Sequence, residues 1–242
     1  MIVPSKGRPQ SLEIVAEAWY KTGAFADGAG LVFAVDDDDP TWPQYRAALD
    51  RLAAADSGPR IINLMNAGPW QPMVHKLDRA AAMFAPRVPA LAFMGDDHRP
   101  RSGGWAGRYV EALRELGTGI VYGNDLVQGE KLPTQWAMTT DIVTVLGRMV
   151  PAPVEHLYCD NSILDLGRAA NCIRYLPDVR IEHCHPVAGR GAWDAGYERV
   201  NSRAQYAADH ARYMAWRADG LEADADKVRA LRAARQQERS PA

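Results

Sequence analysis

The sequence predicts an α/β protein in which a mainly parallel sheet is covered by helices on both faces. Short apolar runs alternate with longer amphipathic stretches through the first half of the chain. The spacing places one helix between successive strands, which is the connection that parallel strands require. With 242 residues, 47% of them hydrophobic, the chain is long enough for one large domain with a helical annex.

The first half of the chain supplies the expected strands and helices in strict alternation. The apolar runs predict strands at residues 2–3, 31–35, 61–65, 90–94 and 120–122. The stretches between them predict helices at residues 9–21, 43–55, 74–84 and 107–116. In the first helix, Leu12, Val15 and Trp19 fall on one face, as in a helix that packs on a sheet.

The pattern changes after residue 123. Three prolines, Pro133, Pro151 and Pro153, predict a loop-rich segment over residues 124–160. A helix is expected over 161–169, strands over 173–176 and 179–185, and helix from Trp193 onward. The charged, alanine-rich stretch 222–239 predicts a solvated or partly frayed helix. We therefore divide the chain into residues 1–123, 124–200 and a helical extension, 201–242.

Composition excludes several classes of protein. The net charge of −2 gives no overall basic field for nucleic acid, although Arg99, Arg101 and Arg108 could form a local patch. No apolar run approaches the roughly 20 residues that cross a bilayer. The N-terminus lacks the apolar core of a signal peptide, and three cysteines are too few for a disulfide framework. These features predict a cytoplasmic protein with no membrane partner.

Polar side chains follow all five expected strands of the first half, at the sheet edge where α/β proteins bind ligands. The first strand is followed by Pro4, Ser5, Lys6 and Arg8, the second by Asp36 to Asp39, the third by Asn66, the fourth by Asp96, Asp97 and His98, and the fifth by Asn124 and Asp125. Any one of these could be an ordinary loop or capping residue. Carboxylates gathered at one edge, however, repel one another unless a cation or ligand compensates.

The chemistry expected at this edge is metal-assisted phosphate binding. Neither G-x-G-x-x-G after the first strand nor a G-x-x-x-x-G-K-[ST] loop is present. Carboxylate oxygens suit Mg²⁺ or Mn²⁺. In "RIEHCHPVAGRGAWD", His183 and His185 share one face of a strand, and Arg190 lies in a glycine-rich loop suited to cover phosphates. In "HLYCDNSILDLG", Asp160 stands at a helix start, where a helix cap is the alternative role.

The order of these features resembles a GT-A type glycosyltransferase, close to the inverting family-2 group, over about residues 1–200. The matching segments are "VPSKGRP" for a Pro-x-x-x-Arg-like turn, "FAVDDDDP" for a nucleoside-binding acidic pair, "FMGDDH" for a D-x-D-like motif, "CDN" for a base and "EHCH" for a metal-binding histidine. "EHCHP" followed by a Gly-Arg loop is also similar to glycosyltransferase-like proteins often carried by phages. One departure stands out, because Gly95 occupies the position of the first aspartate of D-x-D.

The resemblance implies a Rossmann-like GT-A sheet and a metal-dependent transfer of sugar from a nucleoside-diphosphate sugar, with UDP-sugars favoured, to a hydroxyl acceptor with inversion. Residues 1–123 would bind the nucleotide sugar, and 124–200 would hold the acceptor. Donor binding falls to Pro4, Ser5, Arg8, Asp36, Asp38, Asn66, Lys76, Asp96 and Arg190. Asp97 with His183 or His185 would hold Mn²⁺ or Mg²⁺, and Asp160 would be the base, with Asp125 and Asp165 as alternatives. The acceptor would contact Trp105, Tyr122, Asp125, Trp136, Tyr158 and Asn161. The four aromatic residues of this set are expected in loops around the acceptor.

Other functions remain open from the sequence. A sugar-phosphate nucleotidyltransferase would share the sheet and the metal, but "PSKGRPQS" is a poor version of its loop. A metallohydrolase could use His183, His185 and Asp97. A zinc-stabilised binding module could use Cys159, Cys172 and Cys184, although no C-x-x-C pair is present. The acceptor is also open, with a modified DNA base, a glycan and a small molecule as candidates.

Overall fold

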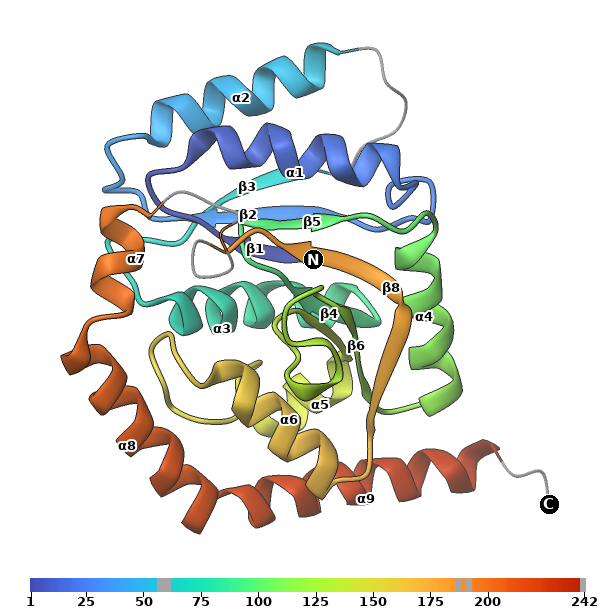
Figure 1. Cartoon of the computed structure of the whole chain (residues 1–242). Coiled ribbons are helices and arrows are strands. Elements are labelled where there is room, and N and C mark those ends of the chain that lie inside the picture. The colour runs from blue at the N-terminus through green and yellow to red at the C-terminus, as the bar shows by residue number, and fades with distance from the viewer. Residues whose placement is uncertain (56–61, 186–188, 190–192, 240–242) are drawn as a thin grey trace.

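A computed structural model describes residues 1–55, 62–185, 189 and 193–239 of the chain (Figure 1). The chain runs in order through β1 (Ile2–Pro4), α1 (Pro9–Lys21), β2 (Leu31–Val35), α2 (Trp42–Ala54), β3 (Ile62–Asn66), α3 (Met73–Phe84), η1 (Ala85–Arg87), β4 (Ala90–Phe93), β5 (His98–Pro100), α4 (Trp105–Leu116), β6 (Ile120–Asn124), η2 (Gly129–Lys131), β7 (Trp136–Thr139), α5 (Thr140–Leu146), α6 (Cys159–Ala169), β8 (Ile173–His183), α7 (Ala195–Val200), α8 (Arg203–Asp219) and α9 (Leu221–Arg239).

The strands form one mainly parallel sheet, which confirms the predicted fold class. Its eight strands stand in the order β3-β2-β1-β4-β7-β6-β8-β5. Neighbours β3, β2, β1 and β4 are parallel, and β6 is parallel to β8. Two strands run against these, because β7 is antiparallel to β4 and β6, and β5 is antiparallel to β8. The carboxyl ends of the parallel strands therefore all lie at the same edge of the sheet.

Helices cover both faces of the sheet (Figure 1). Successive side chains of a strand point to opposite faces, and both faces of these strands are apolar. In β1, Ile2 packs into the core beneath α3, α5 and α6, whereas Val3 packs into the core beneath α1, α2 and α4. Both side chains are almost fully buried. The sheet is thus held rigidly between two cores, which fixes the side chains at its carboxyl edge.

Four elements, β5, β7, α5 and β8, differ from the sequence-based expectation. The segment 124–160 was expected to be loop-rich, but it contains β7 and α5, and all four residues of β7 are buried. β8 is one strand rather than two, with a register shift opposite Gly123 and Asn124. β5 lies in what was expected to be the loop after the fourth strand. β5 and β7 have three and four residues, so neither is long enough to show a period of its own.

The C-terminal helices α8 and α9 lie along the outer side of the α5–α6 layer (Figure 1). Within α9, Ala225 and Val228 are fully buried. Arg229 donates to the carbonyl oxygen of Ala169 at 2.8 Å, and the Trp216 ring N–H donates to Asp224 at 3.0 Å. The expectation that residues 222–239 are solvated or frayed is therefore wrong for this inner face. In the part of the chain that the structure describes, no helix has both the length and the apolarity that a bilayer span needs.

Candidate functional site

A cavity of about 400 Å³ opens at the carboxyl edge of the sheet. It gathers residues from both halves of the chain, although they are far apart in sequence. Of the predicted site residues, those lining it are Pro4, Ser5, Arg8, Lys76, Asp96, Asp97, Tyr158, Asp160, His183 and His185. One hollow therefore holds members of the donor, metal, base and acceptor sets.

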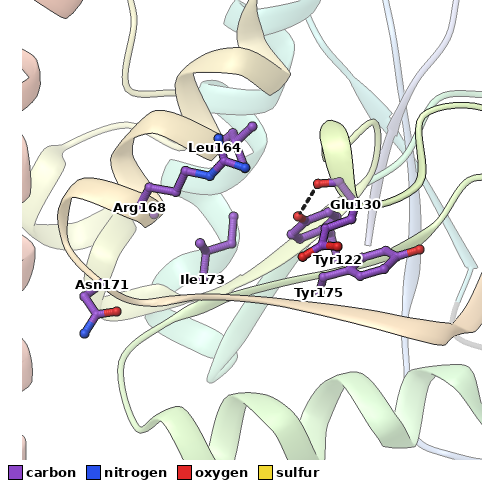
Figure 2. A pocket seen from close by; sticks show the side chains of 8 residues that line it. Tyr122, Glu130, Leu164, Arg168, Asn171, Ile173 and Tyr175 are labelled. Carbon is purple, nitrogen blue, oxygen red and sulfur yellow. Dashed lines mark hydrogen bonds between the residues drawn. The ribbon is translucent and has the colours of Figure 1, made fainter.

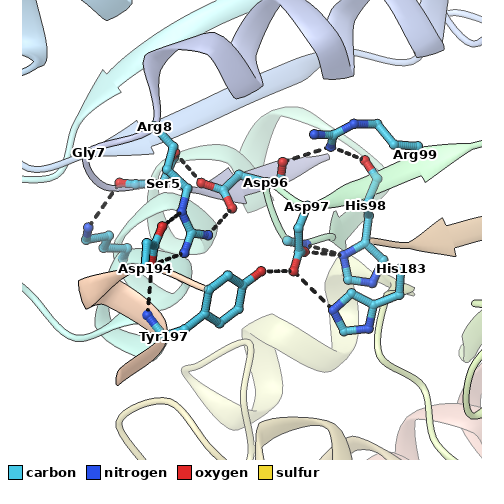
Figure 3. A network of polar contacts seen from close by, with 12 residues as sticks. Ser5, Gly7, Arg8, Asp96, Asp97, His98, Arg99, His183, Asp194 and Tyr197 are labelled. Carbon is cyan, nitrogen blue, oxygen red and sulfur yellow. Dashed lines mark hydrogen bonds and ion pairs between the residues drawn. The ribbon is translucent and has the colours of Figure 1, made fainter. Parts of the chain in front are cut away.

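The centre of the cavity is a carboxylate between two imidazoles (Figure 3). One oxygen of Asp97 lies 3.1 Å from Nδ1 of His98, and the other lies 3.2 Å from Nε2 of His183. The three side chains offer ligand atoms within 4.8 Å of one another, close enough for one metal ion. His185 is adjacent, with its ring centroid 5.0 Å from that of His183, but it is not part of this cluster.

His98 is a site residue that the sequence analysis did not assign. It reaches the cluster because β5 pairs with β8 in a register that sets His98 opposite His183. Their rings stack with centroids 4.1 Å apart and planes 17° from parallel. The available signal was its position next to the aspartates in "GDDH".

The charges of the cluster fit a bound cation. Burial opposes the charged form of His183, but hydrogen bonds to Asp125 and Asp97 outweigh it and raise its pKa to about 9. Burial would raise the pKa of Asp97, yet its hydrogen bonds with His183 and His98 hold that pKa well below the usual value. A protonated His183 thus balances the carboxylates, and a divalent metal bound there would displace its proton. One carboxylate with two imidazoles suits Mn²⁺ better than Mg²⁺, which favours all-oxygen ligands.

The structure explains why glycine occupies position 95. A Cβ atom at Gly95 would lie 2.5 Å from Oδ1 of Asp97 and 2.9 Å from Nδ1 of His98. The backbone nitrogen of Gly95 also lies 3.1 Å from that same Nδ1. An aspartate at this position would collide with the proposed ligands, so the departure from D-x-D follows from packing around His98.

Replacing Gly95 by alanine is expected to weaken Mn²⁺ binding on the order of 10–100-fold, because the added methyl group displaces Asp97 and His98. Isothermal titration calorimetry with Mn²⁺ measures the effect. Gly103→Ala is the matched control, since nothing lies within 4 Å of a Cβ atom built there. Equal Mn²⁺ affinity in both variants would show that Asp97 and His98 do not form the metal site.

A second network links the first strand to α7 (Figure 3). Asp96 accepts from the Ser5 hydroxyl at 2.6 Å and from Arg8 at 3.0 Å. Arg8 makes a bidentate pair with Asp194, at 2.7 and 2.8 Å.

The ring of Tyr197 lies 4.3 Å from the guanidinium carbon of Arg8. The Tyr197 hydroxyl donates to Asp97 at 2.6 Å, so α7 is joined to both acidic residues of the motif. Neither Asp194 nor Tyr197 was predicted, because the pairs Arg8–Asp194 and Asp97–Tyr197 are 186 and 100 residues apart.

Some predicted donor residues lie away from the cavity lining. Asp36 is fully buried and accepts from Lys76 at 2.9 Å and from Lys6 at 3.2 Å, so it positions these lysines. Asp38 is exposed, and the side chain of Asn66 accepts from the backbone of the turn that follows it. None of Asp36, Asp38 and Asn66 lines the cavity. Arg190 lies outside the described residues.

Asp160 lies in the cavity wall in the first turn of α6. Burial raises its pKa to about 6 despite hydrogen bonds from backbone N–H groups. This direction is opposite to the lowering expected from a helix N-terminus, because loss of water outweighs the helix dipole. Asp165, one alternative base, is bound instead to the Tyr213 hydroxyl and to Arg217.

Several predicted acceptor residues lie elsewhere. Trp105 opens α4 and donates to Thr22, and Trp136 lies in β7; both are buried in the core, so their expected place in loops at the acceptor site is wrong. Asp125 is buried under His183, where it accepts from three backbone N–H groups and from Thr134. Those bonds occupy its oxygens, which leaves it poorly placed as acceptor ligand or base. Asn161 does not line the cavity.

Tyr122 lines a different hollow, of about 290 Å³, between α6 and strands β6 and β8 (Figure 2). Its hydroxyl donates to the carbonyl oxygen of Glu130 at 2.8 Å. Arg168 and Tyr175 also face this hollow. Tyr122 is therefore not a wall of the cavity that holds Asp97 and Asp160, contrary to the acceptor role expected for it.

Known structures share this architecture. A mannosyltransferase from Pyrobaculum calidifontis, PcManGT, in complex with GDP-Man and Mn²⁺ superposes with a TM-score of 0.64 at 16% identity, over 98% of this chain and 73% of its own. S. aureus TarS 1-349 in complex with UDP gives a TM-score of 0.59 at 12% identity, over 99% and 71%. The same fragment with UDP-GlcNAc gives 0.54. The chain has a GT-A type fold.

This GT-A fold is not accompanied by a sequence match. No protein-family model matches the chain, and no curated protein matches it. The likeness to the solved enzymes therefore establishes the fold, and the activity has to be argued from the site.

The structure gives no support to a zinc module on the cysteines. Cys159 and Cys172 are buried and Cys184 is partly exposed. Among the described residues, the one cluster with metal-ligand geometry is Asp97, His98 and His183, which contains no cysteine.

Proposed function

We propose that this chain is a metal-dependent glycosyltransferase that moves a sugar from a nucleoside-diphosphate sugar to a hydroxyl acceptor with inversion. One observation carries the proposal. A single cavity at the carboxyl edge of a GT-A type sheet holds the possible metal ligands Asp97, His98 and His183. The same cavity separately holds Asp160, whose pKa is raised to about 6 by burial. The two groups correspond to the two requirements of sugar transfer, a stabilised leaving group and a base.

The donor side is formed by the cluster and nearby cations. Lys6, Arg8 and Lys76 line the same cavity as Asp97. Their positive charges would face the diphosphate, whose negative charge grows as the bond to the sugar breaks. A bound Mn²⁺ or Mg²⁺ would add Lewis-acid stabilisation of that charge. The complexes of PcManGT with GDP-Man and Mn²⁺ and of TarS with UDP-GlcNAc support a donor of this class. We favour a UDP-sugar.

The acceptor side is formed by Asp160. A carboxylate with a pKa near 6 is ionised at neutral pH yet basic enough to accept the proton of an attacking hydroxyl. Attack by that hydroxyl directly on the anomeric carbon is a single displacement, which inverts the configuration. No second carboxylate is needed as an acid, because a diphosphate leaves readily.

The first test is donor binding. UDP- and GDP-sugars are expected to raise the melting temperature in the presence of Mn²⁺ by roughly 5–10 °C at 100 times Kd. In Asp97→Asn this Mn²⁺-dependent rise should vanish, because the carboxylate shared by His98 and His183 is lost.

The matched control is Asp37→Asn, an exposed aspartate that follows β2, two strands away from β4 in the sheet. It should keep the full Mn²⁺-dependent rise. If Asp97→Asn also keeps it, Asp97 does not hold the metal; if no nucleotide sugar stabilises the unmodified chain, the proposed function is wrong.

A further inference from the structure

An aromatic surface leads out of the cavity beside Asp160. Tyr158 lines the cavity two residues before that carboxylate. Its ring stacks on Tyr213 with centroids 5.2 Å apart and planes 16° from parallel. Its ring centroid also lies 5.4 Å from that of Tyr206 and 5.3 Å from that of His210. We call these four residues, Tyr158, Tyr206, His210 and Tyr213, the aromatic shelf.

The shelf is open at its outer end. Tyr206 is 55% exposed, and His210 is exposed one helical turn further along α8. Residues four and three positions apart share one helix face, so Tyr206, His210 and Tyr213 form a row. Tyr206 and His210 are exposed and Tyr213 is buried, and Tyr158 continues the row into the cavity. An aromatic row that has an exposed end, is continuous with a cavity and is unused by the proposed donor site indicates a binding surface.

The shelf is also rigid. The carboxylate of Asp209, fully buried on α8, accepts from the backbone N–H groups of Glu155, His156 and Leu157, at 2.9, 3.0 and 2.9 Å. These bonds hold the segment just before Tyr158 against α8. Because this backbone is held in place before binding, less ordering is needed when a ligand binds.

Two arginines beside the shelf are paired with carboxylates. Arg212 is paired with Glu155 and Asp209, and Arg217 is paired with Asp165. Aromatic faces with polar groups at their edge suit an uncharged ring that carries hydroxyls.

We propose that the aromatic shelf is the acceptor subsite and that the acceptor is a neutral saccharide chain. Sugar rings would stack on Tyr158 and Tyr206, and Gln205, which lines the cavity next to Tyr206, would meet hydroxyls. This arrangement would lead the terminal hydroxyl to Asp160. As an acceptor assignment the inference rests on the proposed function, and it extends the subsite from Tyr158, within residues 124–200, onto α8 in the helical extension.

The test is affinity electrophoresis of the whole chain in native gels that contain soluble neutral glucan, mannan or galactan, with a gel shift on single- and double-stranded DNA in parallel. At least one polysaccharide should retard the unmodified chain. Tyr206→Ala should reduce that retardation at least fivefold, and Tyr206→Phe should keep most of it. Tyr20→Ala, which removes a 52%-exposed tyrosine from α1, is the matched control and should migrate as the unmodified chain.

Three results would overturn the inference: no retardation by any polysaccharide, equal retardation of Tyr206→Ala, or a shift on DNA alone. The donor-binding measurement is independent of this one. A chain that binds a nucleotide sugar but no saccharide contradicts only the acceptor subsite. A chain that binds saccharide but no nucleotide sugar contradicts the proposed function and leaves a carbohydrate-binding surface.

Discussion

Replacing Asp160 by asparagine is expected to lower the rate of sugar transfer by roughly 10²–10⁴-fold, the range that a positioned general base contributes. Asparagine preserves the shape of the side chain and removes its ability to take a proton. Because the base acts only in the transition state, donor and Mn²⁺ affinity should stay unchanged. Single-turnover transfer, with donor binding measured in the same preparation, separates the two effects.

The pH profile gives a second readout for Asp160. The carboxylate must be ionised to act as a base, and its pKa is raised to about 6 by burial. The rate should therefore be level above that pH and fall about tenfold per unit below it. The residual rate of Asp160→Asn should lack this acidic limb.

The matched control is Asp165→Asn, on the same helix, whose carboxylate is bound to Tyr213 and Arg217 and does not line the cavity. It should transfer sugar at nearly the normal rate. Full turnover in Asp160→Asn combined with a lower melting temperature would show that Asp160 only caps α6.

Replacing Asp209 by alanine is expected to destabilise the fold by about 3–5 kcal/mol, because a buried carboxylate with several partners is removed. The backbone N–H groups of Glu155, His156 and Leu157 would lose their acceptor, and Arg212 would lose one of its carboxylates. At this chain length the melting temperature should fall by roughly 6–20 °C. Thermal unfolding followed by circular dichroism measures the shift.

The contribution of Asp209 should depend on pH. Burial alone would raise its pKa, but bonds from the backbone and Gln205 hold it below the ordinary value of 3.8. Its stabilisation is thus fully present above about pH 4 and is lost as the pH falls through the lower, folded-state pKa. Asp219→Ala, at the exposed end of α8, is the control and should change stability by less than about 0.5 kcal/mol. An equal loss in both variants would contradict the role of Asp209.

The local sequence pattern was sufficient to predict the strands that carry the site and the polar residues at their ends. Each long apolar run became a strand close to its expected bounds, and the polar residues at strand ends follow from where those runs stop. Asp97 lies at the cavity for this reason, in the turn that follows the end of β4 at Phe93. The period of hydrophobic residues is a local property, so it can be read without knowledge of the fold.

Errors in the prediction came from side chains whose surroundings are set by packing. Trp105 and Trp136 were expected in loops, but an indole can fill a core as readily as it binds a ligand, and both are buried. The α9 segment is highly charged, yet its small Ala225 faces the core while arginines reach backbone carbonyls at the rim. Composition alone does not reveal which face of such a helix meets a neighbour.

The sequence by itself determined the α/β architecture, the edge of the sheet that carries the ligand site, and the carboxylates placed there. Only the tertiary structure decided the metal cluster and its supports. His98 joins His183 through the register of β5 on β8, and Tyr197 reaches Asp97 across 100 residues of chain. Strand register and helix docking depend on the fit of whole surfaces, and no local period records which distant residues will meet.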